Sequence, residues 1–119
     1  MDERIRFIEH KGQQILLLDF SLATASQMLS LLTQVQITVA QQDPKSVLIL
    51  ADYTGAEIDH KVVMKIKEVL TLDRPFVKKA AWLGTEHMHA TIENLHMFSR
   101  RETVTFTTQE AALEWLVEQ

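Results

Sequence analysis

The chain contains no cysteine, and it has only three glycines and two prolines among its 119 residues. Without cysteine it can form no disulfide bond, no thiolate nucleophile and no sulfur-ligated metal site. No apolar run approaches the roughly 20 residues of a membrane-spanning helix, so we expect no membrane insertion. The charged start, Met-Asp-Glu-Arg-Ile-Arg, is not typical of a signal peptide. We therefore expect a cytoplasmic protein.

Positive charge and catalytic motifs are also scarce. The formal net charge is −4, which argues against nucleic acid as a partner because phosphate binding requires a basic surface. The sequence has no G-x-G-x-x-G pattern, no phosphate-binding loop with G-K-[ST], and no G-x-S-x-G nucleophile turn. We therefore expect a protein that is not an enzyme and that holds no cofactor.

Alternating strand and helix patterns fill the chain. Residues 47–51 are five apolar residues without alternation, which is typical of a strand buried on both faces of a sheet. Further strand patterns cover residues 4–9, 14–20, 77–83 and 103–107. Helical spacing of apolar residues follows residues 24, 59, 85 and 107, and Asp59, Thr85 and Thr107 are the predicted caps of the last three helices. The third predicted helix has the apolar stripe Met88, Ile92 and Leu95. The order is β-β-α-β-α-β-α-β-α, which predicts a mixed, mostly parallel sheet with the first strand antiparallel at an edge.

The helices leave one question open. Sequential right-handed crossovers place helices mainly on one face of the sheet, whereas several strands are apolar on both faces. The last helix, the first helix or a second subunit must therefore cover the other face. Charged residues on the first strand block edge-to-edge pairing, and Leu22, Leu31, Ile37, Met97 and Phe98 lie outside the main helical stripes. We expect a homodimer formed through helices or an uncovered sheet face.

The order and spacing of these segments resemble a known family. The strand ending in Asp52-x-Thr54-Gly55, the segment Pro75-Phe-Val-Lys-Lys-Ala-Ala-Trp-Leu-Gly84 and the closing Phe106-x-x-x-Glu110-Ala-x-x-Trp115-Leu116 are similar to the SpoIIAA-like family. That family is related to STAS domains and more distantly to the CRAL-TRIO lipid-binding fold. The resemblance implies one domain over residues 1–119. It also implies a non-enzymatic regulatory module, with a carrier of a small apolar or amphiphilic, lipid-like ligand as the alternative. The residues that suggest a carrier are apolar: Val62, Val63, Met64, Met88, Met97 and Trp82.

The candidate site lies where two neighbouring strands end. The carboxyl ends of parallel strands meet at one edge of a sheet, and ligands of open α/β sheets bind there. We therefore expect a protein partner or small ligand to bind residues after the two central strands: Asp52, Tyr53, Thr54, Gly55, Gly84, Thr85 and Glu86. The alternative is that Asp52 and Thr54 only bond the backbone of their own turn. In the antagonist branch of the related family this turn carries Asp-Ser-Ser-Gly with a phosphorylated first serine. Tyr53 replaces that serine here, so Thr54 is the candidate for phosphorylation.

Three side chains suggest a metal site at first sight. His89, Glu93 and His96 share one face of the third predicted helix, and Glu-x-x-His occurs in di-iron helical bundles. Those sites require a second copy of the motif and further carboxylates on facing helices, which this chain does not show in its sequence. We expect these residues to cover the edge of the core and to bind no metal.

Overall fold

A central strand that is buried on both sides organises the fold. The computed structural model describes residues 3–88, 90–91, 95 and 103–118. In β3 (Val47–Asp52), five consecutive residues are buried. Ile49 and Ala51 pack into one core cluster, whereas Leu48 and Leu50 pack into a second cluster on the opposite face. The absence of alternation in this segment therefore reflects two cores, one on each side of the sheet.

Five strands form one sheet in the order β1-β2-β3-β4-β5. The strand β1 (Ile5–His10) runs antiparallel to β2 (Gln13–Asp19) at one edge. The strands β2, β3, β4 (Val77–Leu83) and β5 (Thr103–Phe106) are parallel to their neighbours. The mixed sheet with an antiparallel first strand is confirmed.

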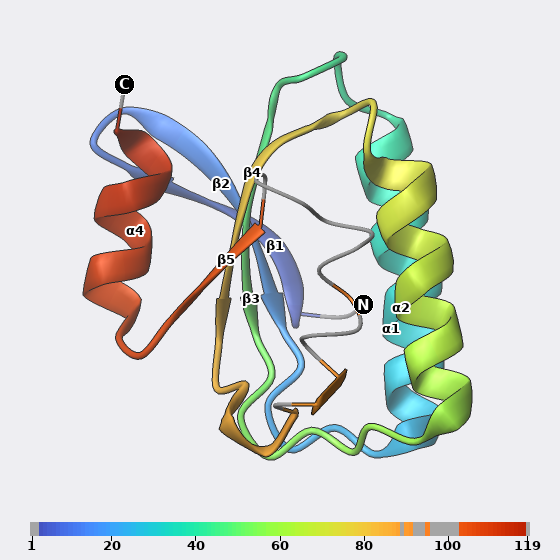
Figure 1. The fold of residues 1–119 in the computed structure, drawn as a ribbon. Helices are drawn as coiled ribbons and strands as arrows, with labels where there is room; N and C mark the ends of the chain where they lie inside the picture. Colours follow the sequence, from blue (N-terminus) through green and yellow to red (C-terminus); the bar gives the residue numbers. More distant parts are fainter. Residues whose placement is uncertain (1–2, 89, 92–94, 96–102, 119) are drawn as a thin grey trace.

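Helices cover both faces of this sheet. Figure 1 shows α1 (Ala25–Ala40) and α2 (His60–Asp73) side by side on one face, and α4 (Gln109–Val117) on the other. Ala112 and Leu116 of α4 are buried in the second core cluster. The sequence left open whether the last helix, the first helix or a second subunit covers the second face of the sheet. The structure shows that the last helix covers it. None of the described helices is long and apolar enough to cross a membrane.

Short polar residues fix where the helices begin. Thr24 caps α1 through a capping box with Gln27, and Asp59 caps α2 by accepting a hydrogen bond from the Val62 amide at 2.9 Å. The predicted cap of the last helix, Thr107, is wrong by one residue. The Thr108 hydroxyl accepts the bond from the Ala111 amide at 3.2 Å, because Thr108 has the extended backbone that a cap requires.

The third predicted helix is described only in part. A short 3-10 helix, η1 (Glu86–Met88), follows β4, and the Thr85 carbonyl accepts a hydrogen bond from the Met88 amide at 2.8 Å. Residues 90, 91 and 95 are helical, and Leu95 is buried in the first core cluster. The predicted stripe of Met88, Ile92 and Leu95 therefore has two of its members in the core. Ile92 lies outside the described residues.

Candidate functional site

Two neighbouring strands end in the same three-residue pattern. Asp19-Phe20-Ser21 begins at the last residue of β2, Asp52-Tyr53-Thr54 begins at the last residue of β3, and the two aspartates are paired in register. Asp19 Oδ1 accepts hydrogen bonds from the Ser21 amide at 3.0 Å and hydroxyl at 2.5 Å. Asp52 Oδ1 accepts the equivalent bonds from Thr54 at 2.9 and 2.6 Å. The alternative in which Asp52 and Thr54 bond their own turn is thus observed, and it occurs twice.

Backbone hydrogen bonds continue the sheet into these turns. The Phe20 amide donates to the Asp52 carbonyl at 2.9 Å, and the Leu22 amide donates to the Thr54 carbonyl at 2.8 Å. The Tyr53 amide donates to the Leu83 carbonyl at 2.9 Å. The turns after three adjacent strands are therefore held in register by the backbone. We call this surface the rim and define it by Ser21, Leu22, Thr54, Gly55 and Glu86.

Tyr53 does not belong to the rim surface, which corrects its place in the predicted site. It is only 3% exposed, and its ring packs between Phe20, at 5.1 Å between centroids, and Trp82, at 4.9 Å. Burial raises the pKa of its hydroxyl well above the usual value. Tyr53 continues the inward alternation of Ile49 and Ala51, so its side chain points into the core beneath α1 and α2. A partner at the rim would meet Thr54 and not Tyr53.

Two glycines allow the turns to pack closely. Gly84 has a φ of +66°, and a Cβ there would lie 2.5 Å from the Thr54 backbone nitrogen and 2.7 Å from its Cα. Gly55 has a φ of +68°, and a Cβ there would lie 2.6 Å from Cδ2 of Leu22. Both positions favour glycine for conformation, and Gly84 also requires it for space, because the clash there is with the backbone of Thr54. The structure therefore brings Gly55, Gly84 and Thr54 together, as the sequence predicted.

The predicted site lacked two residues of the rim, Ser21 and Leu22, and the more exposed of them is Leu22. It is 77% exposed, and its φ of +58° is in the left-handed region that leucine rarely adopts. The hydrogen bond from its amide to Thr54 and the contact with Gly55 hold it there. The only sequence signal was an apolar residue between Ser21 and the start of α1, outside the helical stripe. The structure assigns that residue to the rim.

Most acidic groups near the rim already have donors. Glu57 Oε1 accepts a hydrogen bond from the Ala25 amide at 2.7 Å and so supports the start of α1. Asp59 caps α2, and Asp52 serves its own turn. Glu86 is exposed at the start of η1, and the neighbouring His87 Nε2 lies 2.9 Å from the Ala56 carbonyl. The rim therefore includes one exposed carboxylate, Glu86, two residues after the Gly84 that packs against Thr54.

No metal cluster occurs among the residues that the structure describes. His89, Glu93 and His96, the candidates weighed from the sequence, lie outside the described residues. The expectation of no metal site therefore stays untested at these positions.

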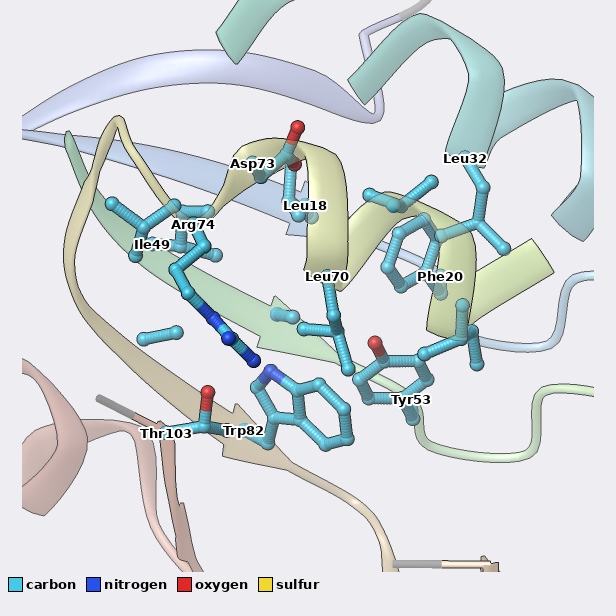
Figure 2. Close-up of a pocket in the computed structure, with 15 residues that line it drawn as sticks. Leu18, Phe20, Leu32, Ile49, Tyr53, Leu70, Asp73, Arg74, Trp82 and Thr103 are labelled. Atoms are coloured by element: carbon cyan, nitrogen blue, oxygen red, sulfur yellow. The ribbon is translucent and has the colours of Figure 1, made fainter. Parts of the chain in front are cut away.

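A cavity lies between the sheet and α2. Its volume is about 60 Å³, and Figure 2 shows the residues that line it, among them Tyr53, Leu70, Asp73, Arg74, Trp82 and Thr103. Pockets for drug-sized ligands occupy about 300–1,000 Å³. The lipid-carrier alternative remains a hypothesis, and the size of this cavity counts against it. Of the residues that suggested a carrier, Val62 and Met88 are in the core, and Met64 is half-exposed.

The architecture is similar to that of a solved structure. This is an anti-sigma-factor antagonist (STAS) domain protein from Planctomyces limnophilus, with a TM-score of 0.63 over 96% of this chain and 98% of that chain. The fold is SpoIIAA/STAS-like. The sequence identity is 10%, so the similarity establishes the fold alone. No family model and no curated protein matches the chain.

Proposed function

We propose that this chain is a non-enzymatic interaction or regulatory module that binds a protein partner through the rim. The observation that carries this proposal is Leu22, a leucine 77% exposed and held at a φ of +58°. Left-handed backbone costs a residue such as leucine about 1–2 kcal/mol. Strained, exposed residues of this kind concentrate at functional surfaces, and a central apolar side chain is the usual anchor of a protein interface.

The surroundings of Leu22 suit a protein partner. Ser21 and Thr54 flank it with hydroxyls, and the STAS-like fold is that of an anti-sigma-factor antagonist domain protein. The backbone ladder between the two turns keeps the rim in one conformation, which lowers the entropy cost of binding. We infer that Leu22 and Thr54 contact the partner, and that Glu86, Thr85 and the backbone of Gly55 and Gly84 complete the surface.

Phosphorylation of Thr54 is a secondary part of this proposal. The Thr54 hydroxyl donates to Asp52 Oδ1 at 2.6 Å. A phosphate in place of the hydroxyl hydrogen would remove this donor and place like charge beside the Asp52 carboxylate. Modification would therefore open the turn and release the partner, and Thr54→Glu should weaken binding in the same direction.

The experiment compares two exposed apolar residues. Tagged wild-type protein, Leu22→Asn and Phe7→Asn are used to capture partners, and each captured protein is then purified and titrated by calorimetry. Phe7 is 41% exposed on β1 and serves as the control. We expect Leu22→Asn to weaken binding by about tenfold or more and Phe7→Asn to leave it unchanged. Asparagine tolerates left-handed backbone, so Leu22→Asn should also melt no lower than wild type.

Two outcomes would overturn the proposal. The first is equal loss of binding in both variants, which would show that the rim has no special role. The second is robust turnover of a small substrate that Asp52→Ala abolishes while the protein stays folded, since this would make the rim an active site.

A further inference from the structure

We propose that the cavity beneath α2 is a binding site for a small carboxylate with a short alkyl chain. The site is separate from the rim and does not depend on the function proposed for it. Its walls come from the sheet, α1 and α2, and most of the residues that line it are apolar. Leu18, Ile49 and Leu70 are among them. These apolar walls favour an alkyl chain, and the polar groups of the cavity determine which polar head group the ligand carries.

Polar side chains that have no hydrogen-bond partner among the described residues face this cavity. Tyr53, Trp82 and Thr103 are 3%, 4% and 7% exposed, and all three line it. Among the described residues, no side-chain hydrogen bond involves the two hydroxyls or the indole nitrogen. Among the described residues, each side-chain nitrogen or oxygen atom that is fully inaccessible to solvent has a hydrogen-bond partner. Side-chain polar atoms without a partner are therefore at least slightly accessible. The polar atoms of these three residues are therefore reachable from the cavity, and buried groups of this kind are normally satisfied by water or a ligand.

The chemistry of these groups selects an acceptor. The Trp82 indole nitrogen can only donate, and the hydroxyls of Tyr53 and Thr103 can donate. Figure 2 shows the guanidinium of Arg74 extending toward the indole nitrogen of Trp82 and the hydroxyl of Thr103. Arg74 has another interaction, but a guanidinium carries several donors and can serve a ligand as well. A carboxylate satisfies several donors at once and matches the positive charge of Arg74.

The charge of Asp73 and the volume of the cavity further restrict which carboxylates can bind. Asp73 also lines the cavity, and burial raises its pKa to about 7, so it carries only part of its negative charge near neutral pH. A volume of about 60 Å³ has room for about four water-sized positions. Acetate or propanoate fits this space, whereas a long-chain fatty acid does not.

The two tryptophans of the chain provide a direct test. Trp82 lines the cavity, whereas Trp115 lies in α4 on the opposite face of the sheet. In protein with 15N-labelled indole groups, sodium propanoate should shift the Trp82 indole resonance saturably, with a millimolar dissociation constant, and leave Trp115 in place. Propan-1-ol, propylammonium and octanoate should not reproduce the shift, because they lack the charge, carry the opposite charge or exceed the cavity.

A matched pair of variants locates the ligand. Thr103→Val removes a hydroxyl inside the cavity at nearly constant volume, and Thr105→Val makes the same change at an exposed residue of the same strand. We expect Thr103→Val to weaken propanoate binding about tenfold or more and Thr105→Val to leave it unchanged. Tyr53→Phe should weaken binding in the same direction.

The proposal is overturned if propanoate up to about 50 mM shifts neither indole or shifts both equally. An equal response to propan-1-ol, or unchanged binding in both Thr103→Val and Tyr53→Phe, would likewise overturn it. The cavity would then contain water only, or would select for size and not for charge.

Discussion

Gly84 is the single residue on which the geometry of the rim depends most. A side chain there would meet the backbone of Thr54, and its φ of +66° is unfavourable for any residue with a Cβ. Gly84→Ala should therefore lower the free energy of unfolding by about 3 kcal/mol, measured by urea denaturation. The control is Gly12→Ala, because Gly12 has a φ of +81° and a Cβ added there would meet no atom within 4 Å. This control should cost only about 1 kcal/mol, and equal losses would contradict the clash with Thr54.

Because of Asp73, the free energy of unfolding should fall as the pH rises. Burial raises the pKa of its carboxyl from 3.8 to about 7, so the folded state holds this proton more tightly than the unfolded chain does. Well below pH 3.8 the carboxyl is protonated in both states, and it does not change the free energy of unfolding. As the pH rises from about 4 to 7, only the unfolded chain ionises, and stability falls until both states are ionised.

Asp73→Asn isolates this effect, because asparagine stays neutral at every pH. The difference in urea midpoint between Asp73→Asn and wild type should grow from about pH 4 to pH 7 and then stay constant. Other titrating groups contribute equally to both proteins and cancel in the difference. A difference that does not change over this range would show that Asp73 ionises alike in the folded and unfolded states.

At the scale of elements, Lys79 of β4 joins the sheet to the C-terminal end of α4 through hydrogen bonds. Its ammonium donates to the carbonyls of Trp115 at 2.7 Å and Glu118 at 3.0 Å, and it lies 4.8 Å from the centre of the Trp115 ring. A cation at a helix C-terminus satisfies carbonyls that have no partner within the helix. Lys79 therefore holds α4 over the second core cluster.

Lys79→Met keeps the length of this side chain and removes its donors. We expect a loss of about 1–2 kcal/mol in the free energy of unfolding, together with faster amide hydrogen exchange confined to α4. Lys78→Met is the matched control, since Lys78 is exposed on the neighbouring position of the same strand. It should change stability by less than about 0.5 kcal/mol. Equal losses in the two variants would indicate a general effect of charge.

The elements that could be predicted from the sequence are those with a local signal. The alternation of strand and helix patterns gave the order of the sheet, and Asp59 was identified as a cap because short polar residues begin helices. Thr107 was predicted as a cap because Glu110 follows it at capping-box spacing, but the extended backbone and the capping hydrogen bond are found at Thr108. The inward direction of Tyr53 was available in principle, since it continues the alternation of Ile49 and Ala51 beyond the end of β3.

Other features depend on contacts between distant segments. The left-handed backbone of Leu22 is held by Thr54 and Gly55, which lie more than thirty positions further along the chain. The described residues that line the cavity come from α1, α2 and the strands β2 to β5 or their ends, from Leu18 to Thr103. Neither has a pattern within any one segment. Sequence periodicity therefore located the rim but did not identify its most exposed residue or the space beneath α2.

At the scale of the whole molecule, the homodimer remains a prediction, and the structure narrows where it can form. Both faces of the sheet are covered, by α1 and α2 on one side and α4 on the other. Charged residues on β1 block that edge. Of the residues that suggested an interface, Leu31 is buried in the core, and Met97 and Phe98 lie outside the described residues. The exposed apolar residues of α1 and α2 remain: Ile37, Met64 and Leu72.

A homodimer should therefore form through the outer surface of α1 and α2, around a twofold axis that buries these residues on both subunits. Light scattering coupled to size-exclusion chromatography should give twice the chain mass of 13.7 kDa at about 50 µM. Ile37→Lys and Met64→Lys would each place a charge in that interface and should return the mass to that of one chain. Thr105→Lys, at an exposed residue of β5, should leave the dimer intact. A mass of 13.7 kDa for the unmodified protein would refute the dimer and leave these apolar residues exposed to solvent or to another partner.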